Sequence, residues 1–396
     1  MRHKQTVTEH CVTWLGFPVL ALALSCGCSN SNLGDVQKAV DAGGTVKFPA
    51  GTYILTDTVV VRKSNTIIEG EGDGTVFLFM PTLPKRHCLN DRAFTTPCDA
   101  ADKPRRQIAN PIAIGDTTFT ASSSVDDLRP GDWLIIEEKD RQPGEVVVFD
   151  WMQVDSAAGN TVNTRTPFRV AFPNARPWDN NLSGLGFYVT SEPVEGVQFR
   201  NFRILVPDPG ANVPGISVFA AKDTVIDNVS VHDFHGQPLY SYLAKGLTVT
   251  NSQAFGNKVL SEFAASVDVT IKNNVFGGNS TAVGLDFGSA FFTLEHNDIP
   301  ISSNSGIYLL YGVHDGFVTD NTLGYVDSDG SAIGVLIRGS QNVSVTGNTL
   351  VGGAGPASKG ISIGAEYLVN PPLWSSGNVI VPNSFGESWA YDYDMP

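Results

Sequence analysis

The amino-acid sequence predicts an all-β protein folded as a right-handed parallel β-helix, with an N-terminal capping helix and a small antiparallel β insertion. Three observations lead to this prediction. The composition, with 40 Gly and only 17% charged residues, is typical of a turn-rich β protein. An asparagine-containing turn recurs along the chain, and each repeat holds three short β-like runs separated by turns. The repeat is 23 to 30 residues long, which is the length of one coil of a β-helix. In such a fold each strand stacks on its equivalent in the next coil.

The first 30 residues have the composition of a signal peptide. Arg2 and Lys4 give a positive start, and Val12 to Leu24 form an apolar run that is too short to span a bilayer. The following "LALSCGCSN" resembles a bacterial lipoprotein processing site with Cys26 as the lipidated residue. We therefore expect an exported protein, either freely secreted or held at the bacterial cell surface through a lipid anchor.

Residues 31–80 are expected to form the N-terminal cap and the first coils. The segment from Asp35 to Val61 indicates a short amphipathic helix, a glycine turn and two strands, and Asn65 to Phe77 indicates another coil. These phrases resemble the opening of the pectate-lyase-like superfamily of right-handed parallel β-helices, which contains polysaccharide lyases and glycoside hydrolases. The resemblance implies that the helix covers the open end of the coil stack and blocks edge-to-edge association.

The repeat is lost over residues 81–184. Here "DDLRPGDWLII" and "VVVFDWMQVDSAAGNTVNTRTPF" predict an inserted antiparallel β subdomain, similar to insertions in bacterial and phage-associated members of the superfamily. Cys88 and Cys98 lie in this segment and could form a disulfide in an oxidising compartment, although two free thiols remain the alternative.

The coils are expected to resume over residues 185–383, before a C-terminal cap or tail at 384–396. Around Asn274, the segment "KNNVF" aligns with others at intervals of 23 to 30 residues, centred on Asn201, Asn228, Asn251, Asn297, Asn321, Asn348 and Asn378. Asparagine tolerates the left-handed backbone of a tight bend, and its amide can bond to the same amide one coil away. We therefore expect an asparagine ladder at one bend. Beside it we expect an inward aliphatic stack of Ile226, Val249, Ile271, Leu294, Val318 and Val345.

Glu262 and Asp286 are the predicted catalytic residues. In the superfamily that this sequence resembles, glycan lies along the outward residues of the first parallel sheet. That sheet is expected at the runs that begin at Gly215, Leu239, Leu260, Gly284, Gly306, Gly334 and Gly360. Aligning Phe263 with Phe287 as inward residues turns both carboxylates outward on adjacent coils, about 5 Å apart. Like charges that close suit one acid and one base or nucleophile, as in retaining glycosidases. The alternative is a solvated acidic face, or an ion pair with Lys245 or Lys272.

Four further residues are predicted to bind substrate, namely Tyr308, His314, Arg338 and His235. Tyrosine offers a sugar-stacking surface, and Arg338 could neutralise a uronate. His314 is followed by Asp315, an order that could supply a base with its orienting carboxylate. We expect ordinary turn chemistry there instead, because sequence neighbours seldom face each other in a turn.

These features predict a carbohydrate-active enzyme that cleaves glycosidic bonds in a polysaccharide or oligosaccharide. Hydrolysis by the carboxylate pair and β-elimination of a uronate polymer both stay open, and a lyase could use Ca²⁺. The sequence carries no strong metal motif, so the metal is unknown. The alternatives are a non-catalytic glycan-binding or adhesion β-helix, and a transferase similar to β-helical inulin fructotransferases, which would imply a homotrimer. The net charge of −14 argues against a nucleic-acid partner.

Overall fold

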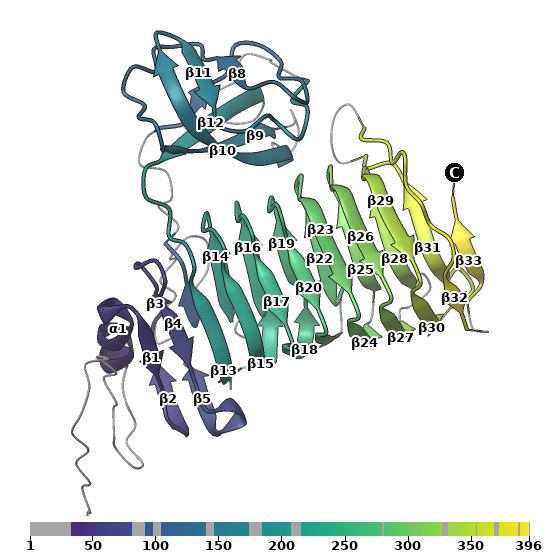
Figure 1. Ribbon diagram of the computed structural model, residues 1–396. Coiled ribbons are helices and arrows are strands. Elements are labelled where there is room, and N and C mark those ends of the chain that lie inside the picture. The colour runs from purple at the N-terminus through teal and green to yellow at the C-terminus, as the bar shows by residue number, and fades with distance from the viewer. Residues whose placement is uncertain are drawn as a thin grey trace, which may run out of the picture.

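The protein is a long stack of β coils with a smaller β domain resting on one edge, as the computed structural model shows (Figure 1). The structure describes residues 33–80, 92–97, 104–139, 146–173, 184–206, 215–278, 281–302, 304–326, 332–353, 355–367, 372–386 and 389–395. Neighbouring strands of the stack pair in parallel throughout these ranges, so the predicted parallel β-helix is confirmed.

One wall of the stack is a parallel sheet of ten strands within the described residues. Each coil contributes one strand to this ten-stranded sheet. Its members are β3 (Val59–Val60), β6 (Phe94–Thr95), β14 (Ile216–Phe219), β16 (Leu239–Tyr242), β19 (Ser261–Ala264), β22 (Val283–Asp286), β25 (Ser305–Leu310), β28 (Ile333–Arg338), β31 (Lys359–Gly364) and β33 (Tyr391–Asp394). The seven predicted runs from Gly215 to Gly360 correspond to β14 through β31, so their placement in one sheet is confirmed.

The rest of each coil forms two legs that meet at a bend and belong to one sheet of 17 described strands. The first leg holds β1 (Thr45–Lys47), β4 (Ile67–Glu69), β17 (Thr248–Thr250), β20 (Thr270–Lys272), β23 (Ala290–Glu295), β26 (His314–Thr319) and β29 (Gln341–Thr346). The second leg holds β2 (Gly51–Leu55), β5 (Thr75–Phe79), β18 (Gln253–Val259), β21 (Val275–Gly278), β24 (Asp298–Ser302), β27 (Thr322–Val326), β30 (Thr349–Gly353) and β32 (Ser384–Phe385). Two longer strands, β13 (Gln198–Leu205) and β15 (Val225–Gly236), run through both legs.

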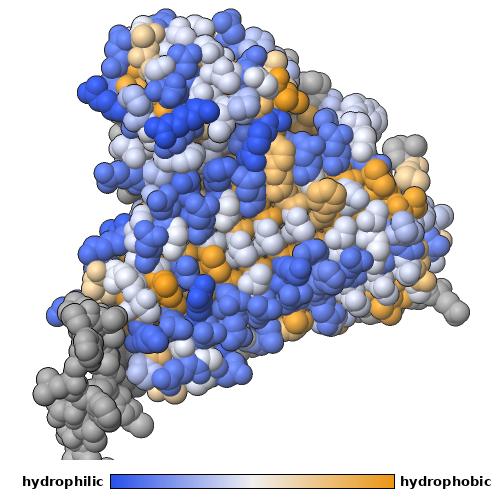
Figure 2. Space-filling view, viewed as in Figure 1, coloured by the Kyte–Doolittle hydropathy of each residue, from blue (hydrophilic) through white to orange (hydrophobic). Residues whose placement is uncertain are grey.

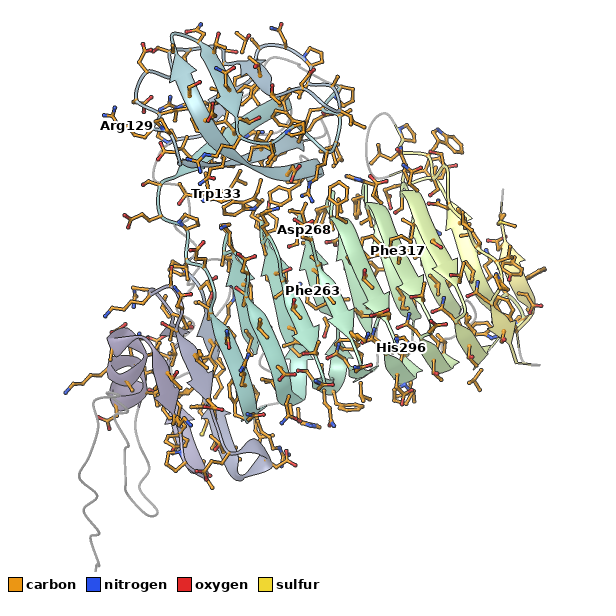
Figure 3. All side chains as sticks on the ribbon, in the orientation of Figure 1. Arg129, Trp133, Phe263, Asp268, His296 and Phe317 are labelled. Carbon is orange, nitrogen blue, oxygen red and sulfur yellow. The ribbon has the colours of Figure 1, made fainter. Side chains whose placement is uncertain are left out.

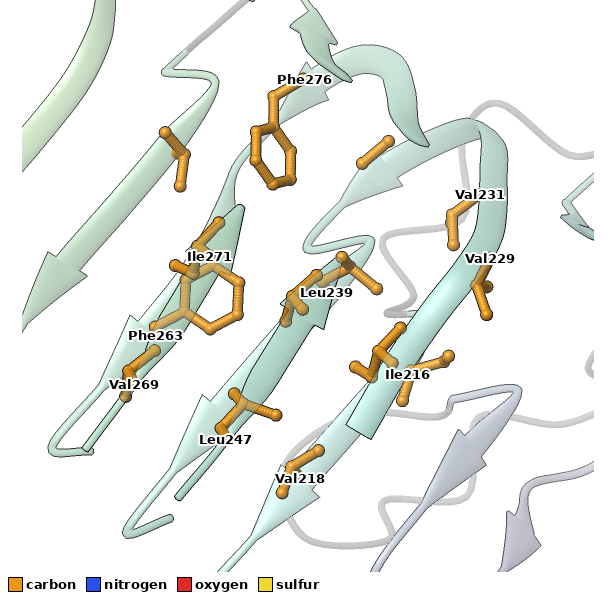
Figure 4. Close-up of a cluster of buried hydrophobic side chains, with 14 of the residues drawn as sticks. Ile216, Val218, Val229, Val231, Leu239, Leu247, Phe263, Val269, Ile271 and Phe276 are labelled. Atoms are coloured by element: carbon orange, nitrogen blue, oxygen red, sulfur yellow. The ribbon is translucent and has the colours of Figure 1, made fainter. Parts of the chain in front are cut away.

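The interior of the stack is filled by columns of apolar side chains (Figure 4). The predicted aliphatic column is confirmed, because its six members pair in succession along the first leg and each is at most 1% exposed. A row of packed phenylalanine rings fills the N-terminal coils, with Phe77 contacting Phe48, Phe94 and Phe202. Burial of this apolar surface is the main favourable contribution to folding.

The asparagine ladder exists, but its membership differs from the prediction. Its amides connect Asn274, Asn297, Asn321, Asn348 and Asn383, where each Nδ2 donates to the next Oδ1 at 2.9–3.0 Å. Asn201, Asn228 and Asn251 instead occupy the preceding residue of the bend, with φ between 52° and 59°. Asn378 lies at a different turn and bonds to the backbone of Val343 and Ser340.

The two asparagine positions serve different physical needs, which explains the error. The first position has left-handed backbone and faces solvent, so it accepts several residue types, including Asn273, His296 and Asp320. The second position points inward, where its amide satisfies backbone groups that the bend would leave buried and unpaired. Adjacent asparagines such as Asn273 and Asn274 fill both positions. The sequence alone therefore does not show which of the two positions an asparagine occupies.

A helix covers the N-terminal end of the stack, as predicted. Helix α1 (Leu33–Ala42) buries Val36 and Val40 against the first coil. Its Gln37 side chain donates to the Val60 carbonyl at 2.9 Å and accepts from the Val60 N–H at 2.8 Å. The edge strand β3 therefore has its exposed backbone groups paired by the cap, which blocks growth of the sheet at this end.

The inserted domain is an antiparallel sheet of six described strands in the order β7-β12-β9-β10-β11-β8. They are β7 (Arg106–Gln107), β8 (Thr118–Thr120), β9 (Trp133–Lys139), β10 (Val146–Ala158), β11 (Thr161–Thr164) and β12 (Gly184–Thr190). The predicted boundaries of 81 and 184 shift, because β6 still belongs to the coils and β12 still belongs to the insertion. A short 3-10 helix, η1 (Gly72–Gly74), precedes β5.

The insertion replaces the turn between β6 and β13 and rests on the equivalent turns of the following coils (Figures 1 and 2). Trp133 and Asp268 lie at this contact, on the insertion and the coils respectively (Figure 3). Its apolar centre contains Ile135, Phe149 and Trp151 from the insertion, and Ala265, Val267 and Ala290 from the coils. The insertion is therefore anchored by packing across the contact.

A charged group fixes the edge of this contact. Arg169 of the insertion donates to Asp268 of the coils at 2.6 Å and to the buried Asp150 at 2.9 Å. Lys245 donates to the same Asp268 at 2.6 Å. Burial alone would raise the pKa of Asp268, but the hydrogen bonds from Arg169 and Lys245 outweigh it and lower that pKa below its usual value.

The chain ends on the ten-stranded sheet. Strand β33 pairs with β31, and Trp389 donates its indole N–H to the Leu350 carbonyl at 3.2 Å. The expectation of a cap or a tail at 384–396 stays a prediction. Some predictions fall outside the described residues. They concern the leader with Cys26, the cysteines Cys88 and Cys98, and the side chain of His235. In the described part of the chain, no helix has the length and apolar character needed to cross a membrane.

We predict that Asn297→Ala destabilises the protein by about 3 kcal/mol, because it removes the side-chain partner of the buried Asn274, Ile271 and Asn321 groups. The midpoint of denaturant unfolding checks this value. Asn251→Gly is the matched control, because Asn251 is exposed and glycine keeps the left-handed backbone accessible. An equal loss in both variants would contradict the distinction between the two positions.

We predict that Asp268→Asn loosens the insertion without unfolding the coils, because it removes the carboxylate that binds Arg169 and Lys245. The lowered pKa of Asp268 makes this stabilisation present above about pH 4 and lost as pH falls through the folded pKa. Amide hydrogen exchange of β9 and β10 measures the loosening. Glu295→Gln, which breaks an ion pair with Lys272 within the coils, should leave that exchange unchanged.

Candidate carboxylate site on the ten-stranded sheet

The outward face of the ten-stranded sheet carries a column of polar and aromatic residues. Tyr240, Glu262, Gly284 and Tyr308 align in register on four successive coils. Side chains alternate along a strand, and Phe263 is fully buried in the core, so Glu262 points outward as predicted. Glu262 therefore has Tyr240 on the preceding coil and Gly284 on the following coil, and Tyr308 lies one coil beyond the glycine.

Asp286 belongs to the neighbouring outward column and pairs with Ala264, so it is not directly opposite Glu262. The predicted alignment of Phe263 with Phe287 is therefore wrong, because Phe263 aligns with Leu285. Strand β22 ends at Asp286, and Phe287 already has a left-handed φ of 51° in the turn. Glu262 and Asp286 are thus diagonal neighbours, with Cα atoms about 8 Å apart instead of about 5 Å.

Tyr308 connects the two columns. A side chain at Gly284 would place its Cβ 2.3 Å from Cε2 of Tyr308, so only glycine leaves room for the ring to lie across this coil. The phenol then donates to Oδ2 of Asp286 at 3.2 Å. Gly284 and Tyr308 therefore act together to bring a hydroxyl donor to the carboxylate.

Glu262 accepts a hydrogen bond from Nε2 of Gln237, which lies two residues before the start of β16. Sequence reasoning missed Gln237. It directly follows "VHDFHG", which contains the predicted substrate-binding residue His235, and one polar residue before a strand gives no sign of its distant partner. Both carboxylates of the pair therefore have a neutral donor.

The site is almost completely covered by protein. Glu262, Asp286 and Tyr308 are 8%, 3% and 9% exposed. Burial, followed by the negative charges of Asp286 and Glu262, raises the pKa of Tyr308 well above its usual value. Tyr308 is therefore a neutral hydrogen-bond donor at physiological pH and does not provide a phenolate base.

Neither lysine considered as an ion-pair partner contacts the two carboxylates. Lys245 pairs with Asp268 at 2.6 Å, and Lys272 pairs with Glu295 at 2.7 Å on the other sheet. This excludes the ion-pair alternative for these two lysines. Their burial also distinguishes Glu262 and Asp286 from a solvated acidic face.

His314 lies away from this site. It begins β26 in the 17-stranded sheet, beyond the turn that follows Tyr308. Its Nδ1 is 2.9 Å from Oδ2 of Asp315, so the expectation that these neighbours would not face each other is wrong. The left-handed φ of 53° at Asp315 turns the carboxylate back toward the ring, and the hydrogen bond from His314 lowers the pKa of Asp315.

Arg338 is exposed and lies outward on the ten-stranded sheet, as predicted. It pairs with Leu310 on the preceding coil, so it stands two coil spacings, about 10 Å, from Asp286. Its positive charge acts on the C-terminal Asp394, whose pKa is lowered mainly by the hydrogen bond from Lys359. The structure therefore does not bring Arg338 together with the carboxylate pair.

The insertion adds a second polar group at the edge of the same sheet. Arg105 and Glu137 form a buried ion pair at 2.9 Å, next to Tyr188 of the insertion and Tyr242 of β16. Burial, then the charge of Glu137, raises the pKa of Tyr188 to about 12. Sequence analysis could not place Arg105 here, because its partners come from strands that meet it only in the folded domain.

No group of three or more His, Cys, Asp or Glu residues in the described ranges is arranged to hold a metal ion. The Ca²⁺ expected for a lyase therefore stays a prediction, without an assigned set of ligands.

Comparison with solved structures finds the same fold in proteins of distant sequence. The enzymatically active domain of bacteriophage CBA120 tailspike protein 2 is 11% identical with a TM-score of 0.52, over 93% of this chain and 44% of that one. A variant of the DFA-IIIase of Arthrobacter chlorophenolicus A6 is 12% identical with a TM-score of 0.50, over 92% and 82% of the two chains. The tailspike protein gp49 of Pseudomonas phage LKA1 is 14% identical with a TM-score of 0.49, over 92% and 71%.

A search of curated protein sequences finds no match to this chain. Residues 178–323 match the family described as the right handed beta helix region. This range runs from before β12 to the start of β27, and it includes Gln237, Glu262, Asp286 and Tyr308. This match agrees with the parallel coils of the structure.

Proposed function

We propose that the protein is an exported carbohydrate-active enzyme that hydrolyses glycosidic bonds in a polysaccharide at the outward face of the ten-stranded sheet. The observation that carries this proposal is the buried cluster of Glu262, Asp286 and Tyr308 on that face. Two carboxylates held close together in a partly desolvated site can divide the roles of acid and base. The fold is shared with the enzymatically active domain of a phage tailspike, which supports an enzymatic function on this fold.

The hydrogen bonds alone do not divide the roles within the pair, because each carboxylate accepts from one neutral donor, Asp286 from Tyr308 and Glu262 from Gln237. One carboxyl group of the pair is the acid that protonates the leaving oxygen, and the other is the base that activates water. The two residues are offset diagonally, with Cα atoms about 8 Å apart, which favours the inverting arrangement, in which the carboxyl groups stand about 6.5–9.5 Å apart and leave room for that water.

β-Elimination receives less support from this geometry. A lyase needs a base and a group that neutralises the uronate carboxylate. The raised pKa of Tyr308 makes it a poor base, and Arg338 is about two coil spacings from Asp286. Two further arginines, Arg105 and Arg106, are engaged by Glu137 and Asp127. The fructotransferase-like transfer and its homotrimer stay predictions.

Glycan binding without catalysis is the second candidate. The observation that favours it is the low exposure of both carboxylates, which leaves little of either accessible to a reacting oxygen. Incubation with neutral and uronic polysaccharides separates the candidates. Reducing ends without unsaturated product indicate hydrolysis, and ultraviolet absorbance of an unsaturated product indicates a lyase. Retained binding with no product would overturn the enzymatic proposal.

We predict that Glu262→Gln and Asp286→Asn each lower kcat by about 100-fold or more, because each removes one partner of acid–base catalysis. Release of reducing ends is the measurement, and thermal unfolding verifies that each variant is folded. Asp298→Asn is the matched control, because this exposed carboxylate lies in β24 of the other sheet. If both site variants keep the wild-type rate, the carboxylate assignment is wrong.

We predict that Tyr308→Phe keeps the fold and lowers kcat about tenfold, because the ring still covers Gly284 while the donor to Asp286 is lost.

The raised pKa of Tyr308 also predicts that the phenol stays neutral in the folded protein above pH 10, where an unfolded tyrosine ionises. Its stabilising effect is thus complete below pH 10 and declines as pH rises toward the folded pKa. An ultraviolet titration of the wild-type protein and of Tyr308→Phe tests whether the folded phenol ionises at a higher pH than an unfolded tyrosine. A Tyr308 phenol that ionises below pH 10 would contradict this prediction.

A further inference from the structure

A polar cavity of about 470 Å³ lies on the 17-stranded sheet, away from the carboxylate cluster. It is bounded by η1 and by strands β13, β15 and β18 near the N-terminal end of the stack. This volume falls within the range of known small-molecule sites, about 300–1,000 Å³. None of the residues assigned to the carboxylate site lines it.

The strand register supplies the wall of the cavity. Arg203, Ser230 and Gln253 align on three successive coils and form one outward column. Asn228 and Asn251 belong to the adjacent bend column, and Asp73 of η1 closes the opposite side. Planar amide, guanidinium and carboxylate groups therefore surround the space at the coil spacing of about 4.8 Å.

Several of these groups keep hydrogen-bonding capacity. The guanidinium of Arg203 makes no hydrogen bond within the described residues, and its ion pair with Asp73 is long, at 3.9 Å. Asn228 and Asn251 use their Nδ2 groups on Asn201 and Asp227. Their Oδ1 atoms have no donor in the described part of the chain, so the wall presents donors and acceptors together.

An aromatic surface borders the polar wall. The His232 ring stacks on Phe255 of the next coil, with centroids 5.5 Å apart and planes at 18°. Its Nε2 lies 2.5 Å from Oγ of Ser230, which fixes the ring orientation. A Cβ at Gly277 would lie 2.8 Å from the Phe255 ring, so glycine lets that ring extend over the following coil. Stacked rings of this kind offer an apolar face beside polar groups.

We propose that this cavity is a second saccharide-binding site, which takes one uncharged hexose-type unit of a glycan. Each sugar hydroxyl both donates and accepts, which matches the mixed wall of Arg203, Asn228, Asn251 and Gln253. Arg203 and Asp73 oppose each other in charge, which favours an uncharged ligand over an anion. The proposal goes beyond the catalytic site and does not depend on catalysis there.

Ligand-detected NMR tests the proposal with methyl glycosides of glucose, galactose and mannose, each at about 10 mM, tenfold above a Kd of about 1 mM. The full chain carrying Glu262→Gln and Asp286→Asn serves as the background, so that the carboxylate site does not confuse the result. We expect at least one glycoside to bind. We expect Arg203→Gln to weaken that binding about tenfold or more, because a charged donor is lost.

Arg200→Gln is the matched control, because Arg200 lies three residues earlier in β13 and does not line the cavity. It should leave the affinity unchanged, and thermal unfolding should show that both arginine variants are folded. Failure of all three glycosides to bind would overturn the proposal, as would equal binding by the background protein with and without Arg203→Gln. Displacement of the bound sugar by inorganic phosphate would identify an anion site and overturn it as well.

Discussion

Coil-on-coil stacking is the constraint on which the rest of this structure depends. Parallel strands repeat at about 4.8 Å, so every inward side chain must fit directly above its equivalent in the next coil. The aliphatic column from Ile226 to Val345 meets that condition with apolar contact, and the amides of Asn274 to Asn383 meet it with hydrogen bonds. The same stacking carries the outward residues, so it also sets the distances between functional groups.

The insertion depends on that stack as well. It leaves the coils at one turn and returns to the next leg, so the turns of later coils form a continuous surface on which it rests. An apolar cluster that includes Trp151 forms the centre of this contact, and the Arg169 to Asp268 pair fixes its edge. Its Arg105 and Tyr188 then meet Tyr242, on the outward face that carries the carboxylates.

Much of the fold could be predicted from the sequence, because each coil repeats a similar pattern of residues along the chain. The inward column, the capping helix and the strands of the ten-stranded sheet all follow from local patterns. The errors have one physical origin, namely that loops of varying length hide the register. Asn251 and Asn274 look equivalent although they differ by one position in the bend, and Phe287 looks like the partner of Phe263 although β22 has ended before it.

Within the candidate site, the sequence could predict only the features that follow from side-chain alternation along a strand. Alternation correctly placed Glu262 and Asp286 on the outward face, yet it could not give their offset. The contribution of Gln237 and the ion pair of Arg105 with Glu137 depend on contacts between distant segments, which no local pattern records.

The anomeric configuration of the first product, followed by proton NMR on a polysaccharide that the protein cleaves, tests the central claim most directly. The proposed inverting arrangement of Glu262 and Asp286 predicts inversion at the cleaved carbon, because a water activated by the base then attacks the sugar from the side opposite the leaving group. Retention of configuration would require a carboxylate close enough to attack the sugar itself. That result would contradict the account of the site given by the coil register.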